Sequence, residues 1–188
     1  MKILFFNRAL RILLWTNALI LMAGAMFGPI YALFVEEIGG DLMDASIAGA
    51  VFTLAAGVTT LASGYYSDRA RESELIVVFG YALMGAGFLG YLFVHTIFAL
   101  FVVQAIVGIG EAIYSPAFDA IYSKHLDGHR SGKQWGAWES MYYFVATAGA
   151  VAGGYLATRF GFNMLFVVMA LLCFGSALYI YKLKRRVL

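Results

Sequence analysis

The stretch ASGYYSDRARESE, residues 62–74, places five charged side chains and two tyrosines within thirteen residues. The chain around it is strongly apolar, because residues 45–67 and 75–94 each form a run without a charged side chain. A helix of about 20 mostly apolar residues is long enough to cross a bilayer. The charged stretch is therefore predicted to be a turn at the membrane surface, between two spanning helices.

The composition of the whole chain is that of a membrane protein. Hydrophobic residues make up 62% of it and charged residues only 13%, with a mean hydropathy of +0.81. A net charge of +2 is too small to indicate binding to nucleic acid. The single cysteine, Cys173, allows no disulfide within the chain. No metal-ligand spacing and no Gly-x-Ser-x-Gly motif occurs, so neither a metal site, a cofactor nor an enzyme is predicted.

Six segments are long and apolar enough to span a bilayer. They are residues 12–35, 45–67, 75–94, 96–122, 135–158 and 160–181. The chain is predicted to be an all-α membrane protein with six transmembrane helices, which form one domain over residues 1–188.

The positively charged residues indicate the orientation. Twelve of the 13 lysines and arginines fall in the N-terminal segment, in the loops after the second and fourth spans, and in the C-terminal tail. Only Arg159 lies on the other side. Because cytoplasmic loops are enriched in lysine and arginine, both termini are predicted to be cytoplasmic. The predicted location is the plasma (inner) membrane, crossed several times.

The opening stretch also contains a motif. The sequence Gly64-Tyr-Tyr-Ser-Asp68-Arg69-Ala-Arg71 resembles the signature loop of the major facilitator superfamily, in which a glycine precedes Asp-Arg by four residues. Arg71 stands where that motif has a later glycine. The resemblance implies a gating loop formed by Gly64, Asp68 and Arg69. It also implies that the aspartate contacts the other half of a transporter on the cytoplasmic side.

Two further stretches support the resemblance, which covers the whole chain. QAIVGIGEAIYSPA, residues 104–117, is similar to the fourth helix of the superfamily, although Gln104 replaces a basic residue. GAVAGG, residues 149–154, is similar to the fifth-helix motif of proton-coupled exporters, with Ala150 in place of proline. The resemblance therefore implies a transporter that works by alternating access.

The sequence also contains an internal repeat. The pattern Gly-Tyr-x-x-x-Arg at residues 64–69 recurs at 154–159, and the only two prolines, Pro29 and Pro116, lie 87 residues apart. An odd number of spans gives the two repeats opposite topology. The prediction is a 3+3 inverted repeat, half of a major facilitator fold, with units 1–94 and 95–188.

Members of the superfamily usually have twelve helices, whereas six are predicted here. The two halves of a facilitator are parallel repeats, so two copies of this chain in one orientation would supply both. A parallel homodimer is therefore predicted; the alternative is a fragment of a longer protein.

In the family the second and fifth helices face the opposite half. Here each carries a row of small residues, which lets membrane helices approach closely. The rows are predicted to face the second copy; the alternative is that they pack within one protomer. The rows are Ala45, Gly49, Thr53 and Gly57, and Ala146, Ala150, Gly154 and Thr158.

Polar residues recur on one face of three predicted helices. A charged side chain at mid-bilayer costs about 2.5–3.5 kcal/mol on insertion scales, so it normally faces a cavity or a partner. Glu111, near the middle of its span, is the strongest candidate. The predicted substrate and proton site consists of Asn17, Tyr31, Gln104, Glu111, Ser115, Asp119, Trp135, Glu139 and Tyr142.

The same residues indicate what is transported. No lysine or arginine lies at mid-membrane to pair with Glu111. Such a carboxyl group is favoured in its neutral form, which suits uptake and release of a proton. Acids without buried cations disfavour an anion, so the substrate is predicted to be a small neutral, sugar-like solute. The alternatives are an organic-cation or multidrug proton antiporter, and a non-transporting accessory membrane protein. The predicted partners are the solute, protons, membrane lipid and a second copy.

Overall fold

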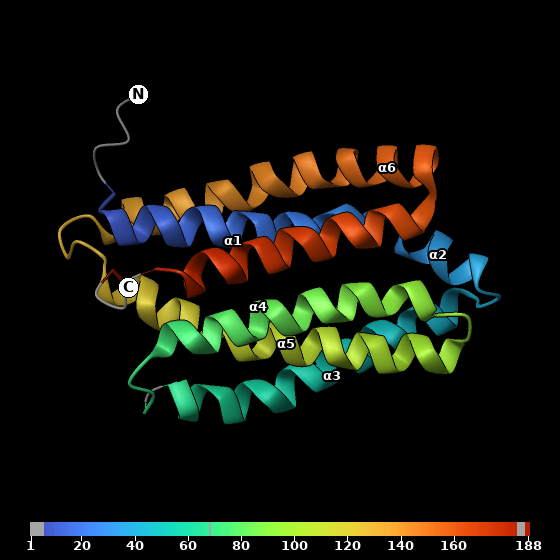
Figure 1. Cartoon of the computed structure of the whole chain (residues 1–188), viewed down its shortest axis with the longest axis horizontal. Helices are drawn as coiled ribbons and strands as arrows, with labels where there is room; N and C mark the ends of the chain where they lie inside the picture. Colours follow the sequence, from blue (N-terminus) through green and yellow to red (C-terminus); the bar gives the residue numbers. More distant parts are fainter. Residues whose placement is uncertain (1–5, 68, 184–186) are drawn as a thin grey trace.

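The computed structural model describes residues 6–67, 69–183 and 187–188, and every regular element in these ranges is helical (Figure 1). The elements in chain order are α1 (Arg8–Phe27), η1 (Gly28–Ile30), α2 (Tyr31–Glu37), α3 (Leu42–Ser67), α4 (Ser73–Gly90), η2 (Tyr91–Phe93), α5 (Ile97–Lys124) and α6 (Ser131–Tyr181). The charged stretch that opens the sequence analysis lies where predicted, at the turn between α3 and α4.

Five helices in the described part of the chain are long and apolar enough to cross a membrane. They are Arg8–Glu37, Leu42–Ser67, Ser73–Phe93, Ile97–Lys124 and Ser131–Tyr181. The prediction of an all-helical, multi-pass membrane protein is therefore confirmed. The last helix has 51 residues. If straight it would be about 76 Å long, more than twice the thickness of the hydrocarbon core of a bilayer.

Helix α6 reverses direction at one glycine. Gly161 has φ 79° and ψ 170°, a backbone conformation that only glycine adopts readily. Figure 1 shows α6 running along the upper edge of the bundle, turning back, and returning beside α1. Residues 131–160 and 162–181 thus form two arms, here called the first arm and the second arm. These arms correspond to the fifth and sixth predicted spans. That each arm crosses the membrane stays a prediction.

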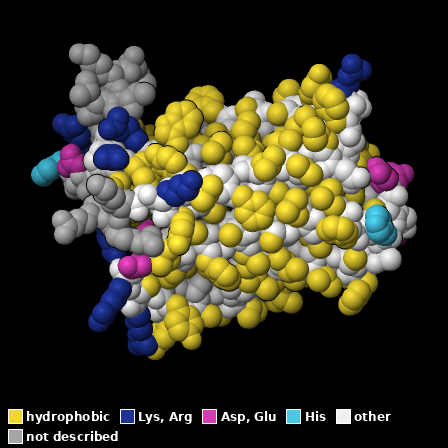
Figure 2. Space-filling model, viewed as in Figure 1, with side chains coloured by type: hydrophobic (Ala, Val, Ile, Leu, Met, Phe, Trp, Pro, Cys, Tyr) yellow, Lys and Arg dark blue, Asp and Glu magenta, His cyan; other side chains and the backbone are white. Residues whose placement is uncertain are grey.

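The helices lie side by side along one axis (Figure 1). Helix α1 begins, and the second arm ends, at the same end of the bundle. Figure 2 shows lysine and arginine side chains gathered at this end, with a hydrophobic band over the middle of the visible face. This distribution is the one that the predicted orientation requires.

Glycines let pairs of helices approach closely. A Cβ atom on Gly108 of α5 would overlap the backbone carbonyl of Phe52 in α3. A Cβ atom on Gly153 of the first arm would overlap the carbonyl oxygen of Met26 in α1. Small residues at such contacts are typical of packed membrane helices. The second helix of each predicted repeat therefore packs against the first helix of the other.

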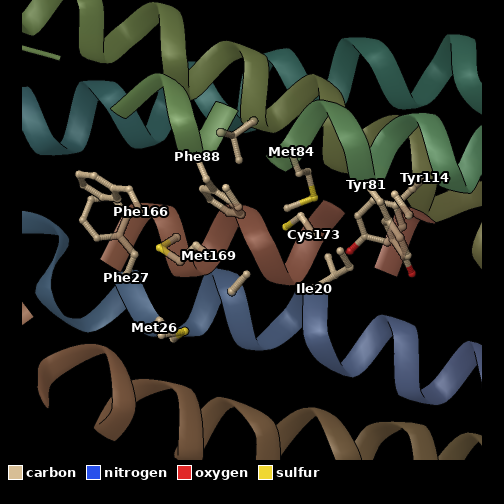
Figure 3. Packing of buried hydrophobic residues seen from close by; sticks show 14 of the residues in the cluster. Ile20, Met26, Phe27, Tyr81, Met84, Phe88, Tyr114, Phe166, Met169 and Cys173 are labelled. Atoms are coloured by element: carbon tan, nitrogen blue, oxygen red, sulfur yellow. The ribbon is translucent and has the colours of Figure 1, made fainter. Parts of the chain in front are cut away.

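The second arm packs between α1 and α4. Figure 3 shows Met84 beside Cys173 in this layer, with Met169 further along toward Phe166, and the side chains of Met169 and Cys173 are fully buried. At the end opposite the basic residues, the ring of Phe27 contacts that of Phe166 at a centroid distance of 5.1 Å. This core fixes α1 and α4, and with them the helices that surround the candidate site.

Candidate functional site

A cavity of about 260 Å³ lies among α1, α4, α5 and the first arm. Its walls are mostly apolar, with Ile20 and Leu21 from α1 and Met84 from α4. The open backbone at Gly24 adds space on the α1 side, since a Cβ atom there would meet nothing within 4 Å. Three of these four helices, namely α1, α5 and the first arm, carry the polar residues that the sequence analysis singled out.

Three polar side chains line this cavity: Glu111 and Tyr114 of α5, and Tyr142 of the first arm. Glu111 is the only charged residue among the described lining residues. The structure therefore brings together Glu111 and Tyr142, two members of the predicted site that come from different helices. Tyr114 lies three residues after Glu111, on the same side of α5, and was not part of the prediction.

Asn17 does not line the cavity; it joins three helices. It is 2% exposed. The indole Nε1 of Trp138 donates a hydrogen bond of 3.0 Å to Asn17 Oδ1. Asn17 Nδ2 in turn donates to the hydroxyl of Tyr81 at 3.4 Å. The ring of Tyr81 lies edge-on to that of Tyr114, 4.8 Å between centroids. Asn17 thus contacts the cavity through Tyr114, which lies within reach of its side chain, and through Tyr81 behind it.

Gln104 and Tyr31 form a second polar contact, nearer the start of α5. Gln104 is buried and lies two helical turns before Glu111. The Tyr31 hydroxyl lies close enough to Gln104 for a weak polar interaction, but it has no hydrogen bond of regular geometry in the described structure. A buried hydroxyl without a hydrogen-bond partner is able to donate a hydrogen bond to a bound molecule.

The remaining predicted residues lie outside the cavity. Trp135 packs against Tyr122, with 4.8 Å between ring centroids, and Ser115 is half-buried on α5. Asp119 and Glu139 are both exposed at the surface of the single chain. The structure therefore does not gather these four residues around Glu111.

The predicted gating loop is described in part. Asp68 lies outside the described residues. Arg69 places its guanidinium group 3.7 Å from the centre of the Tyr65 ring, a cation–π contact. A Cβ atom at Gly64 would meet nothing within 4 Å, so this glycine is not required for packing inside the chain.

Sequence patterns missed Tyr81, Tyr114 and Trp138. Tyr114 was detectable, because it lies one turn from Glu111 on an already polar face. Tyr81 and Trp138 carried no such signal. The role of each depends on which side chain of another helix stands at the same depth.

Comparisons with known proteins found several relatives of this chain. An uncharacterized MFS-type transporter of Methanocaldococcus jannaschii, MJ1560, is 25% identical over 169 residues, which are 89% of this chain and 44% of that protein. The multidrug resistance protein MdtG of Serratia proteamaculans is 24% identical over 87% of this chain and 41% of its own length. The chain thus spans less than half the length of these relatives. An uncharacterized MFS-type transporter of Bacillus subtilis, YitZ, is 24% identical over 85% of this chain and 97% of its own length.

The family-wide sequence pattern of the Major Facilitator Superfamily matches residues 13–187, nearly the whole chain. The bundle of apolar helices, the close glycine contacts between them and the intramembrane acid at Glu111 are all found within this range. On this evidence the chain belongs to the Major Facilitator Superfamily.

Proposed function

We propose that two parallel copies of this chain form a proton-coupled secondary transporter of a lipophilic organic cation. In this proposal the protein works in the plasma membrane by alternating access, with both termini in the cytoplasm. The observation that carries it is a cavity with mostly apolar walls, in which Glu111 is the only charged residue among the described lining residues.

The chemistry of the cavity favours a cation over a sugar. A sugar needs many hydrogen-bonding groups, whereas most lining residues here are apolar. A lipophilic cation gains contact with the apolar walls and a charge interaction with Glu111. The rings of Tyr114 and Tyr142 add faces for cation–π contacts. The sugar-like solute predicted from the sequence remains the alternative, and the printed name of MdtG, a multidrug resistance protein, agrees with the cation.

Proton coupling follows from competition for one carboxylate. The deprotonated Glu111 attracts a cation, and the protonated form does not. A proton that enters from one side therefore displaces a cation that entered from the other. The exchange needs no second charged group in the cavity, which matches the described lining.

The homodimer is supported by two poorly covered edges of the bundle. Helix α3 and the first arm lie at opposite edges in Figure 1. Large apolar side chains on both are exposed, such as Leu61 at 82% and Val151 at 73%. A Cβ atom at Gly49, Gly57 or Gly154 would meet nothing within 4 Å. These glycines do not serve packing inside the chain, so they are free to serve a contact with a partner.

A shared site also fits the size of the cavity. At about 260 Å³ it lies just below the usual range of about 300–1,000 Å³ for small-molecule sites. Tyr142 is 41% exposed, so one side of the site reaches the surface of the single chain. A second copy against this surface would enlarge and close the site.

Transport is tested with the purified chain in sealed vesicles that carry a pH gradient. Tetraphenylphosphonium serves as the lipophilic cation and a neutral disaccharide as the competing solute. We expect gradient-driven movement of the cation, its loss in Glu111→Gln, and no loss in the matched control Glu36→Gln, whose carboxylate is exposed near a helix end. Cation exchange at the normal rate in Glu111→Gln contradicts the coupling role. Movement of the disaccharide alone supports the sugar alternative, and no flux of either solute supports the accessory protein.

Assembly is tested by cysteine crosslinking between two differently tagged copies, each with Cys173→Ala. Gly49 lies seven residues after the start of α3, and Gly154 lies seven before Gly161, so both have similar depth in the bundle. We expect one copy with Gly49→Cys to crosslink to another with Gly154→Cys. Gly175→Cys, on the second arm, is the control and should not crosslink. If the Gly175→Cys control crosslinks as much as the pair of Gly49→Cys and Gly154→Cys, the crosslinks come from random collision.

A further inference from the structure

A second hollow, separate from the Glu111 cavity, opens between α1 and the second arm. Its volume is about 660 Å³. Its walls are formed by Trp15 and Leu19 from α1 and by Gly175 and Tyr179 from the second arm. Trp15 is 74% exposed and Tyr179 is 53% exposed, so the hollow is open to the surroundings of the bundle. In a membrane those surroundings are lipid.

Two arginines stand at one end of this hollow. Arg8 and Arg11 lie three residues apart in the first turns of α1, and both line the hollow and are exposed. None of the described lining residues is acidic. Neither arginine forms a salt bridge with another residue in the described part of the chain. The end of the hollow is therefore positively charged and matches an anion.

The floor of the hollow offers contact but no unsatisfied polar group. Ser176 Oγ donates to the carbonyl oxygen of Thr16 at 3.2 Å. Thr16 Oγ1 donates to the carbonyl oxygen of Ile12 at 2.9 Å. At Gly175 a Cβ atom would meet nothing within 4 Å, so the missing side chain leaves room above the floor. An apolar chain fits such a surface better than a polar molecule does.

The length of the hollow matches the hydrocarbon thickness of one leaflet of the bilayer. From Arg8 to Leu19 the helix advances eleven residues, about 16 Å along its axis. Half of a hydrocarbon core of about 30 Å is about 15 Å. Figure 2 shows the basic side chains at the end of the bundle and the hydrophobic band beside them. A molecule with its charge at the arginines and its tail along Leu19 would thus lie as a lipid does in the bilayer.

We propose that this hollow binds one anionic glycerophospholipid, with its phosphate at Arg8 and Arg11 and an acyl chain along Trp15, Leu19 and Gly175. Basic residues near a membrane surface favour anionic lipid by about fivefold each. The two arginines then favour an anionic over a zwitterionic lipid by about thirtyfold, which is about 2 kcal/mol at 1.4 kcal/mol per factor of ten. This site does not depend on the proposed transport.

The test uses the exposed Trp15 as a reporter. The purified chain in mixed micelles is titrated with phosphatidylglycerol or phosphatidylcholine, each brominated on its acyl chains to quench tryptophan fluorescence. Subtracting the signal of Trp15→Phe removes the contribution of Trp135 and Trp138. We expect half-maximal quenching at about thirtyfold less phosphatidylglycerol than phosphatidylcholine.

Two matched variants separate the arginine site from the general surface charge. The double variant Arg8→Gln/Arg11→Gln should lower the preference for phosphatidylglycerol over phosphatidylcholine to near one. Arg71→Gln/Lys124→Gln removes two exposed charges outside the hollow and should keep the preference. Equal loss in both double variants would refute the site, because the preference would then come from the overall charge of the surface. Circular dichroism of each variant confirms that the helices are kept.

Two further measurements identify the occupant. Gly175→Leu adds a side chain at a point where a Cβ atom would meet nothing within 4 Å, so it should occupy part of the hollow and weaken quenching by both lipids while the protein stays folded. Unchanged quenching in Gly175→Leu would contradict binding of an acyl chain in the hollow. Excess inorganic phosphate should not displace the brominated phosphatidylglycerol. If it does, the arginines form a site for free anions and the lipid assignment is wrong.

Discussion

Two neighbouring glycines in the first arm should respond to alanine in opposite ways. Gly153 faces α1, where an added Cβ atom would overlap the Met26 carbonyl oxygen and lie 2.6 Å from its Cα. Gly154 is turned away by about 100°, and an added Cβ atom would meet nothing within 4 Å. The two substitutions add the same methyl group, so their difference reports the contact with α1.

The size of the difference follows from the geometry. Two carbon atoms pack at about 3.5–4.0 Å, so α1 and the first arm must separate by about 1 Å to accept Gly153→Ala. Overpacking of this kind typically costs about 1–3 kcal/mol. Both variants gain up to about 1 kcal/mol because alanine is the better helix former, and this gain cancels in the comparison. We expect Gly153→Ala to be less stable than Gly154→Ala by about 1–3 kcal/mol.

The assay is equilibrium unfolding of the purified chain in mixed micelles with increasing denaturing detergent, followed by circular dichroism. The midpoint of Gly153→Ala should fall below that of the unchanged protein, and the midpoint of Gly154→Ala should not. Equal midpoints for the two variants would refute the close contact between α1 and the first arm. They would also refute the assignment of Gly153 to the inner face.

Three other substitutions test separate parts of the structure. Gly161→Ala should cost about 1–3 kcal/mol in the same unfolding assay, because φ 79° and ψ 170° are accessible mainly to glycine. Trp138→Phe should cost about 1–3 kcal/mol by removing the hydrogen bond to the buried Asn17, whereas Trp15→Phe, at an exposed position, should change stability by less than about 0.5 kcal/mol. Asp68→Asn should slow transport and shift the resting population toward the inward-open form. Labelling of a cavity cysteine from the cytoplasmic side would detect this shift. Equal labelling of the variant and the unchanged protein would mean that the loop is an ordinary turn.

The sequence was sufficient for the helices and for the centre of the candidate site. The turn between α3 and α4 was predictable, because a charged stretch between two long apolar runs has no place inside a bilayer. Glu111 was predictable for the same reason, since an isolated acid at mid-span needs a cavity or a partner. The face shared by Gln104, Glu111 and Ser115 follows from the period of the helix.

Contacts between helices were not predictable to the same degree. Asn17 was predicted to face the solute, but its amide is used by Trp138 and Tyr81. Asp119 and Glu139 were predicted at the site; both are exposed on the single chain and neither lines the cavity at Glu111, so their role stays a prediction. Periodicity fixes which residues share a face of one helix. It does not fix the rotation and depth of that helix against its neighbours, and these decide which polar groups meet.

The glycines of the spanning helices show the same limit and lead to a last prediction. From sequence alone, a glycine that packs inside the chain and one that faces a partner look alike. In the structure, Gly108 of α5 meets the backbone of α3, whereas Gly57 of α3 has open space around it. Leucine at Gly108 should therefore destabilise the single chain, since it would force α3 and α5 apart.

Leucine at Gly57 should leave the stability of the single chain unchanged and weaken its assembly. Crosslinking between Gly49→Cys and Gly154→Cys copies, measured at increasing dilution in lipid, reports assembly, and unfolding in micelles reports the single chain. If Gly57→Leu leaves both unchanged, the exposed face of α3 packs against lipid, and the proposed homodimer loses its main support. If it weakens crosslinking alone, the open glycines of α3 belong to an interface that only a second copy completes.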